Sequence, residues 1–102
     1  MWKVMLADDE KSIRTALGTL IDWQSLDCEV VYMARSGQDV LDHIGQYRPD
    51  LLITDIRMPG VDGVELLRRI RERPELSAIP VVMATAKGAE YDKVQSLDLG
   101  AD

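Results

Sequence analysis

Cysteine is almost absent from this sequence, and so is any long hydrophobic run. Cys28 is the single cysteine among 102 residues, which excludes an internal disulfide and suits a protein of a reducing compartment. The apolar segment near the N-terminus ends at Asp8, well short of a signal sequence and of the roughly 20 apolar residues that cross a membrane. We therefore expect a cytoplasmic protein with no membrane association.

Basic residues are also scarce, with 12 of them against 18 acidic residues and a formal net charge of −6. They are scattered, except for four on one predicted helix: Arg68, Arg69, Arg71 and Arg73. A broad basic face, which phosphate backbones attract, is missing, so we expect no direct nucleic-acid contact by this segment. The glycine-rich signatures of nucleotide-binding loops, G-x-x-x-x-G-K and G-x-G-x-x-G, do not occur either.

What is present is the composition of one small folded domain. Hydrophobic residues make up 46% and charged residues 29% of the chain, a balance that is typical of globular proteins and unlike disordered ones. A chain of 102 residues is long enough for one core but not for two. We therefore expect a single domain.

Two hydrophobic periods alternate along the chain. Short continuous apolar runs predict buried strands at residues 4–7, 30–32, 51–54 and 81–84. Apolar residues at the i, i+3, i+4 spacing of amphipathic helices predict helices around residues 13–21, 40–44, 64–70 and 91–97. Ser12 is the predicted cap of the first helix, and Val64, Leu67 and Ile70 form the predicted apolar stripe of the third.

This alternation predicts the α/β class. Right-handed βαβ crossovers give a doubly wound, flavodoxin-like parallel sheet with helices on both faces, for which we expect the strand order 2-1-3-4. In such sheets ligands bind outside the carboxyl ends of the strands, where the strand order reverses. The residues that follow each strand are therefore the candidates for function.

Four polar side chains follow the predicted strands at this edge. Asp8 and Asp9 come after the first strand, Asp55 after the third and Thr85 after the fourth. Because strands one and three are neighbours about 5 Å apart in this order, their terminal carboxylates must share a small volume. Carboxylates this close repel one another unless a cation joins them. Mg²⁺ suits such oxygen ligands, because it takes one or two carboxylates together with phosphate oxygens and waters.

This arrangement is suited to phosphoryl transfer. A divalent ion would neutralise charge on an incoming phosphoryl group, which a carboxylate could then attack. Asp55 is the predicted nucleophile because it stands singly at its strand end, and the Thr85 hydroxyl could donate a hydrogen bond to a phosphoryl oxygen. Pro59 and Gly60 predict a sharp turn that lets a nearby main-chain carbonyl, that of Arg57, face the metal.

These motifs resemble the receiver domain of two-component response regulators over the whole chain. The resemblance rests on Asp8-Asp9-Glu10, Asp55 with Met58-Pro59 and Asp62-Gly63, Ala84-Thr85-Ala86 and Gly100-Ala101-Asp102. It implies Asp55 as the phosphoacceptor, Thr85 as the switch hydroxyl, and Asp8, Asp9, Asp55 and the Arg57 carbonyl as ligands of Mg²⁺. The family's members are signalling domains rather than enzymes, with at most self-catalysed phosphorylation and dephosphorylation.

The resemblance also implies the partners. The phosphoryl donor would be a histidine on a sensor histidine kinase or a phosphotransfer protein, and the receiver would control an output domain or effector, which we expect to be transcriptional. Residues 20–23 resemble the subgroup whose output is an AraC-type DNA-binding module.

One family feature is missing from these residues. Receivers carry a lysine after a fifth strand, beyond the Gly-Ala-Asp step, and the sequence contains neither this lysine nor the fifth strand and fifth helix. We therefore expect a C-terminally incomplete receiver domain over residues 1–102. Because an uncovered fourth strand would expose its edge, we also expect partial disorder or pairing at residues 81–84, as a dimer or a domain swap.

Two alternatives stay open. A receiver-like module could bind or dimerise without being phosphorylated, which the missing lysine makes worth keeping. A haloacid dehalogenase-type phosphohydrolase also places a nucleophilic aspartate after a parallel strand, but it needs an Asp-x-Asp pair on the first strand, where this chain has Asp8-Asp9-Glu10. Outside these motifs, His43 is interpreted as a solvated surface histidine without a partner.

Overall fold

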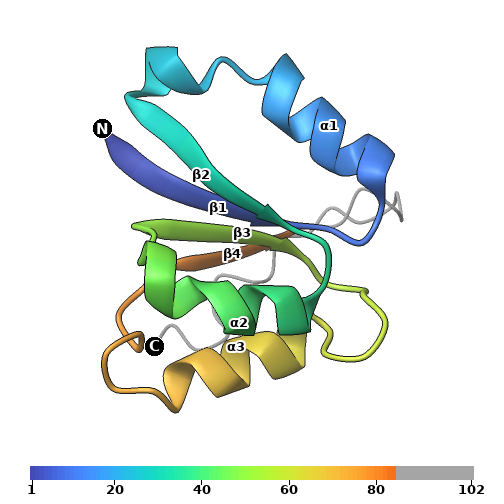
Figure 1. Ribbon diagram of the computed structural model, residues 1–102, viewed down its shortest axis with the longest axis vertical. Helices are drawn as coiled ribbons and strands as arrows, with labels where there is room; N and C mark the ends of the chain where they lie inside the picture. The colour runs from blue at the N-terminus through green and yellow to red at the C-terminus, as the bar shows by residue number, and fades with distance from the viewer. Residues whose placement is uncertain (85–102) are drawn as a thin grey trace.

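A computed structural model describes residues 1–84 of the chain (Figure 1). The elements in order are β1 (Trp2–Ala7), α1 (Lys11–Leu20), the short 3-10 helix η1 (Trp23–Leu26), β2 (Cys28–Ala34), α2 (Gly37–Tyr47), β3 (Leu51–Asp55), α3 (Gly63–Arg71) and β4 (Val81–Ala84). The four predicted strands and the first three predicted helices are confirmed. The fourth predicted helix, at residues 91–97, lies outside the described residues.

The strands form one parallel sheet in the order β2-β1-β3-β4, as predicted. Helix α1 lies on one face of this sheet, and α2 and α3 lie together on the other (Figure 1). The doubly wound, flavodoxin-like α/β fold is therefore confirmed. None of the helices in this part of the chain has the length and apolar character needed to cross a membrane.

The hydrophobic core lies between the sheet and the pair α2 and α3. Its most deeply buried side chains are Met5, Val40, Ile44, Leu52, Leu66, Ile70, Leu76 and Met83. The predicted stripe of α2, which includes Val40, Leu41 and Ile44, is buried there. In contrast, α1 has no fully buried residue. Most of the described core therefore holds α2 and α3 in place, and these elements flank the end of β3.

The buried face of α3 contains two of its three predicted residues, Leu67 and Ile70, but not Val64. Val64 is 51% exposed, whereas Leu66 is fully buried. The helix begins at Gly63, which packs against the end of β3, and the buried positions follow i, i+3, i+4 and i+7 from that residue. Because each helical residue turns the side chain by about 100°, Val64 points away from the core.

Strand β2 contains an irregularity that the sequence pattern did not predict. Val30 pairs with Val4 and Tyr32 pairs with Met5, so Val31 is an extra residue in β2. Side chains alternate along a strand, and one inserted residue reverses the faces of all that follow. Tyr32 is consequently turned to the side of α2, where it packs against the core.

Polar side chains cap two of the three described α-helices. Ser36 caps α2 and Asp62 caps α3, and each accepts a hydrogen bond from the main-chain N–H three residues further on, at 3.0 and 2.9 Å respectively. Helix α1 begins two residues earlier than predicted, at Lys11, with Glu10 in the cap position. The prediction of Ser12 as the cap is therefore wrong.

The central position of Leu52 gives a test of this core. Leu52 is fully buried on β3 between two neighbouring strands, so we expect Leu52→Ala to lower the free energy of unfolding by about 2–5 kcal/mol. Val64→Ala, at an exposed position of α3, should change it by less than about 0.5 kcal/mol. Urea denaturation followed by circular dichroism measures both. Similar losses in the two variants would contradict the described core.

Candidate functional site

Three aspartates come together at the carboxyl edge of the sheet. Asp8 and Asp9 directly follow β1, and Asp55 is the last residue of β3. The two strands pair side by side as far as Ala7 and Thr54. Each aspartate offers one carboxylate oxygen, and these oxygens all lie within 4.8 Å of one another. The structure therefore brings the three predicted side chains into one cluster.

The acidic cluster is largely shielded from water. Asp8 is 4% exposed and Asp55 is 3% exposed, while Asp9 is partly exposed. Carboxylate groups this close repel one another, and burial removes much of the water that would screen this repulsion. A bound cation relieves both effects, so the cluster is a candidate cation site.

The donor atoms fit a hard divalent cation. All three are carboxylate oxygens, which Mg²⁺ and Ca²⁺ prefer, whereas zinc and copper sites are built mainly on histidine and cysteine. A site with few protein ligands leaves room for waters, which Mg²⁺ keeps. Asp8, Asp9 and Asp55 are thus able to hold Mg²⁺. The carbonyl of Arg57 as a further ligand stays a prediction.

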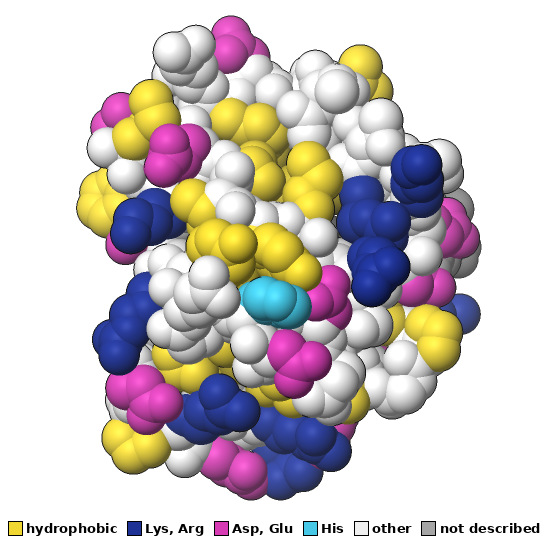
Figure 2. All heavy atoms as spheres, viewed as in Figure 1, with side chains coloured by type: hydrophobic (Ala, Val, Ile, Leu, Met, Phe, Trp, Pro, Cys, Tyr) yellow, Lys and Arg dark blue, Asp and Glu magenta, His cyan; other side chains and the backbone are white. Residues whose placement is uncertain are grey.

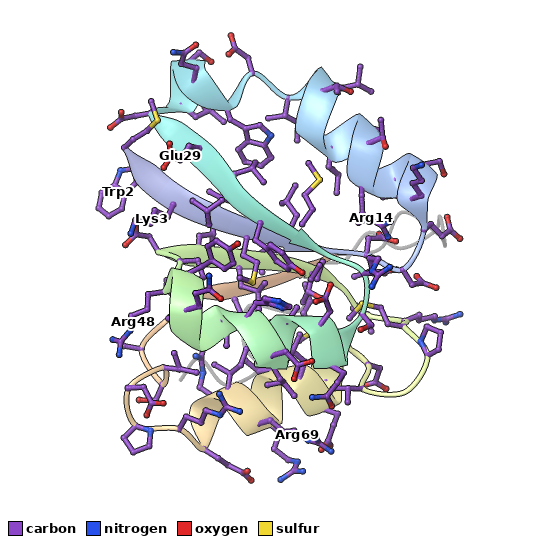
Figure 3. The ribbon with its side chains drawn as sticks, viewed as in Figure 1. Trp2, Lys3, Arg14, Glu29, Arg48 and Arg69 are labelled. Carbon is purple, nitrogen blue, oxygen red and sulfur yellow. The ribbon has the colours of Figure 1, made fainter. Side chains whose placement is uncertain are left out.

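Main-chain contacts fix Asp8. Its N–H donates to the carbonyl of Ala34 at the end of β2, at 3.1 Å. Its carboxylate Oδ1 accepts the N–H of Glu10 at 2.9 Å, a local turn that orients the side chain at the start of α1. Arg14 reaches from α1 to donate to the Asp8 carbonyl at 2.8 Å, and its label in Figure 3 lies near the carboxyl end of β1. Asp8 is therefore anchored by three hydrogen bonds, from the end of β2 and from the start and first turns of α1.

Close packing of Gly63 fixes the main chain at Asp55. The Gly63 N–H donates to the carbonyl of Ile56 at 2.8 Å, which closes the turn after β3. A Cβ at Gly63 would lie 2.8 Å from the Asp55 carbonyl oxygen and 2.9 Å from the Ile56 Cα, closer than such atoms can approach. Gly60, with φ of 79°, adopts the left-handed conformation that glycine tolerates best, in agreement with the predicted sharp turn.

The turn after Asp55 also forms an open surface pocket. The pocket is lined by Ile56, Arg57, Met58, Pro59 and Asp62. The pocket belongs to the connection that follows Asp55, and none of the three aspartates is among its lining residues. Thr85, the predicted switch hydroxyl, lies outside the described residues, so its place relative to the acidic cluster stays a prediction.

Sequence reasoning missed the groups that hold the aspartates. Ala34 and Glu10 act through main-chain atoms, and their residue types therefore leave no signal in the sequence. Gly63 does leave one, because an Asp-Gly step at the start of a helix indicates a cap followed by a close approach of backbone. The pattern located the acids but not the backbone that positions them.

Gly63 provides a test of this positioning. The Cβ of Gly63→Ala must displace the turn that carries Asp55, so we expect Mg²⁺ to bind about tenfold more weakly, as when groups that orient metal ligands are changed. Gly45→Ala is the matched control, because a Cβ at this position in α2 has no atom within 4 Å. Isothermal titration calorimetry with MgCl₂ compares them, and equal affinities would show that Gly63 does not position the site.

Comparisons with known proteins agree with this geometry. A family model of the response regulator receiver domain matches residues 4–102. The REC domain of AraT, a response regulator from Geobacillus stearothermophilus, is 37% identical, with a TM-score of 0.74, and the match covers 82% of this chain and 64% of that one. The N-terminal domain of a response regulator receiver protein from Methanoculleus marisnigri is 32% identical, with a TM-score of 0.76 and coverage of 85% and 68%.

The chemotaxis response regulator CheY4 of Vibrio cholerae is similar as well. It is 30% identical, with a TM-score of 0.70, and the match covers 81% of this chain and 67% of that one. The chain thus spans about two thirds of each of these structures. With the acidic cluster at the carboxyl edge of a 2-1-3-4 parallel sheet, and a family match over nearly its whole length, the chain belongs to the response regulator receiver domains.

Proposed function

We propose that Asp55 accepts a phosphoryl group from a histidine of a sensor kinase or phosphotransfer protein. The observation that carries this proposal is the cluster of three carboxylate oxygens within 4.8 Å, at the ends of two adjacent strands. Asp8 and Asp9, together with Asp55 and the Arg57 carbonyl, would hold Mg²⁺. When bound, this ion would supply positive charge beside the incoming phosphoryl oxygens.

The division of roles follows from how each carboxylate is held. Asp8 Oδ1 already accepts the N–H of Glu10, which suits a side chain that orients a cation. Asp55 is the last residue of β3 and stands singly at its strand end, whereas Asp8 and Asp9 form an adjacent pair after β1, so we infer that Asp55 is the carboxylate that meets the incoming group. An Asp55 oxygen forms the new bond to phosphorus while the phosphorus–nitrogen bond of the donor histidine breaks, and the imidazole keeps the bonding electron pair.

Phosphorylation of Asp55 would give the protein a role in signalling rather than in the catalytic conversion of a substrate. We propose that residues 1–102 act as one cytoplasmic receiver domain that controls an output domain or effector, with transcription, including an AraC-type output, as the expected class. Within residues 1–84, β4 pairs with β3 and with no second strand. Its outer edge is therefore where we expect a further strand to pair, from this chain or from a second copy.

Phosphorylation can be tested directly. After incubation with MgCl₂ and acetyl phosphate, intact mass spectrometry should show one added phosphoryl group on the protein. Asp55→Asn should abolish the addition, whereas Asp42→Asn, at an exposed position of α2, should retain it. No addition to the parent protein would favour a binding module that is not phosphorylated, and continuous release of phosphate from other phosphoesters would favour a phosphohydrolase.

Thr85 has a separate test as the predicted switch hydroxyl. A charge-assisted hydrogen bond from Thr85 to the phosphoryl group would bias the surrounding loop between two conformations. Amide chemical shifts recorded with the beryllofluoride mimic should therefore change less far from the site in Thr85→Ala than in the parent. Identical distal shifts in both proteins would remove Thr85 from the mechanism.

A further inference from the structure

Asp39, in the first turn of α2, is the centre of a hydrogen-bond network outside the acidic cluster. Its Oδ1 accepts from the Tyr32 hydroxyl at 2.8 Å, and its Oδ2 accepts from the Arg35 N–H at 2.9 Å. The Nδ1 of His43 lies 3.0 Å from Oδ1 and 2.9 Å from the Asp39 carbonyl oxygen, so this nitrogen carries the proton. The interpretation of His43 as a residue without a partner is therefore wrong.

Aromatic stacking holds Tyr32 in this network. Its ring stacks on His43 with 4.6 Å between ring centroids and on Tyr47 with 5.0 Å. The histidine side chain, cyan in Figure 2, lies at the surface between hydrophobic and acidic side chains. The extra residue Val31 in β2 is what turns Tyr32 towards α2. The irregularity of β2 therefore has a local consequence, which is to place the Tyr32 hydroxyl on Asp39.

Asp39 is ionised at neutral pH. Partial burial acts to raise the pKa of its carboxyl, but the hydrogen bonds from the Arg35 N–H and the Tyr32 hydroxyl, together with the nearby Arg35 guanidinium, hold this pKa below its usual value. The hydrogen bond to Asp39 in turn raises the pKa of Tyr32. Because the acceptor is charged and the donor neutral, these hydrogen bonds are stronger than those between neutral groups.

The network holds the connection at residues 34–37, which contacts Asp8 at one end and the loop after β3 at the other. The Arg35 N–H that Asp39 binds lies within it. One residue earlier, the Ala34 carbonyl accepts the main-chain N–H of Asp8. At its other end Gly37 packs against Val61, in the loop that follows β3, so closely that a Cβ at Gly37 would lie 2.8 Å from the Val61 Cβ.

We propose that Asp39 is a positioning residue for the acidic cluster. By holding the Arg35 N–H, it fixes the turn that sets the backbone of Asp8 and supports the loop beyond Asp55. Asp39 itself is far along the chain from the three acids and acts through main-chain contacts. The inference rests on the proposed function for the identity of the cation, but the placement of Asp8 can be measured with no cation present.

The test compares Asp39→Ala and Tyr32→Phe with the parent protein. Tyr32→Phe keeps the stacked ring and removes only the hydroxyl donor. We expect faster hydrogen exchange at the Asp8 and Arg35 amides in both variants, measured by NMR without Mg²⁺. Asp39→Ala removes the acceptor of the Arg35 N–H, Tyr32→Phe leaves that acceptor less firmly held, and either change loosens the Ala34 carbonyl that accepts the Asp8 N–H. In MgCl₂ titrations, Asp39→Ala should bind about tenfold more weakly, and Tyr32→Phe should lie between it and the parent.

Two controls separate positioning from general loss of stability. Ile70→Val opens a small void in the core under α3, and should speed exchange broadly without singling out Asp8. Gln38→Ala removes a surface hydrogen bond to Asp42 on the same helix and should change neither readout. Unchanged exchange at Asp8 in both Asp39→Ala and Tyr32→Phe would overturn the proposal. If the parent does not bind Mg²⁺, the proposed function fails, while the exchange data still decide the role of Asp39.

Discussion

The adjacency of β1 and β3 is the constraint on which the site depends. Parallel pairing from Val4 with Leu51 to Ala7 with Thr54 brings the carboxyl ends of two distant chain segments to one place. The acids at the ends of these strands therefore start from neighbouring positions at the edge of the sheet. Their mutual repulsion is a cost of the fold, and binding of a cation is the most direct way to offset it.

The rigidity of this site comes from main-chain contacts more than from side-chain hydrogen bonds. Gly37 and Gly63 lie where one backbone segment approaches another too closely for a side chain, and the Ala34 carbonyl holds the N–H of Asp8. Such contacts leave little room for the loops to drift, because packed backbone tolerates only small displacements. The three loops around the acids are therefore held by the same strands and helices that form the core.

The sequence pattern was sufficient to predict the strands, their order and the meeting of Asp8 with Asp55, because burial on both faces produces continuous apolar runs. It did not predict the extra residue Val31, because Val30 and Val31 are alike in size and polarity and nothing in the pattern shows which is inserted. Nor did it predict that Val64 is exposed, since the phase of α3 is set by the packing of Gly63. The main-chain groups of Ala34 and Glu10 that hold Asp8 have no residue signature, whereas the Asp62-Gly63 step does leave one.

The charge at the site explains why modification of one residue could be felt beyond it. Phosphorylation would convert the carboxylate of Asp55 into a group of about two negative charges that extends further from the strand. Nearby positive charge would be needed both before and after the transfer, because Asp8 and Asp55 are buried. In the phosphorylated state, the added negative charge would lie among the surrounding loops. If Asp55 is phosphorylated, we expect the added charge to favour one packed arrangement of these loops over another rather than a gradual deformation.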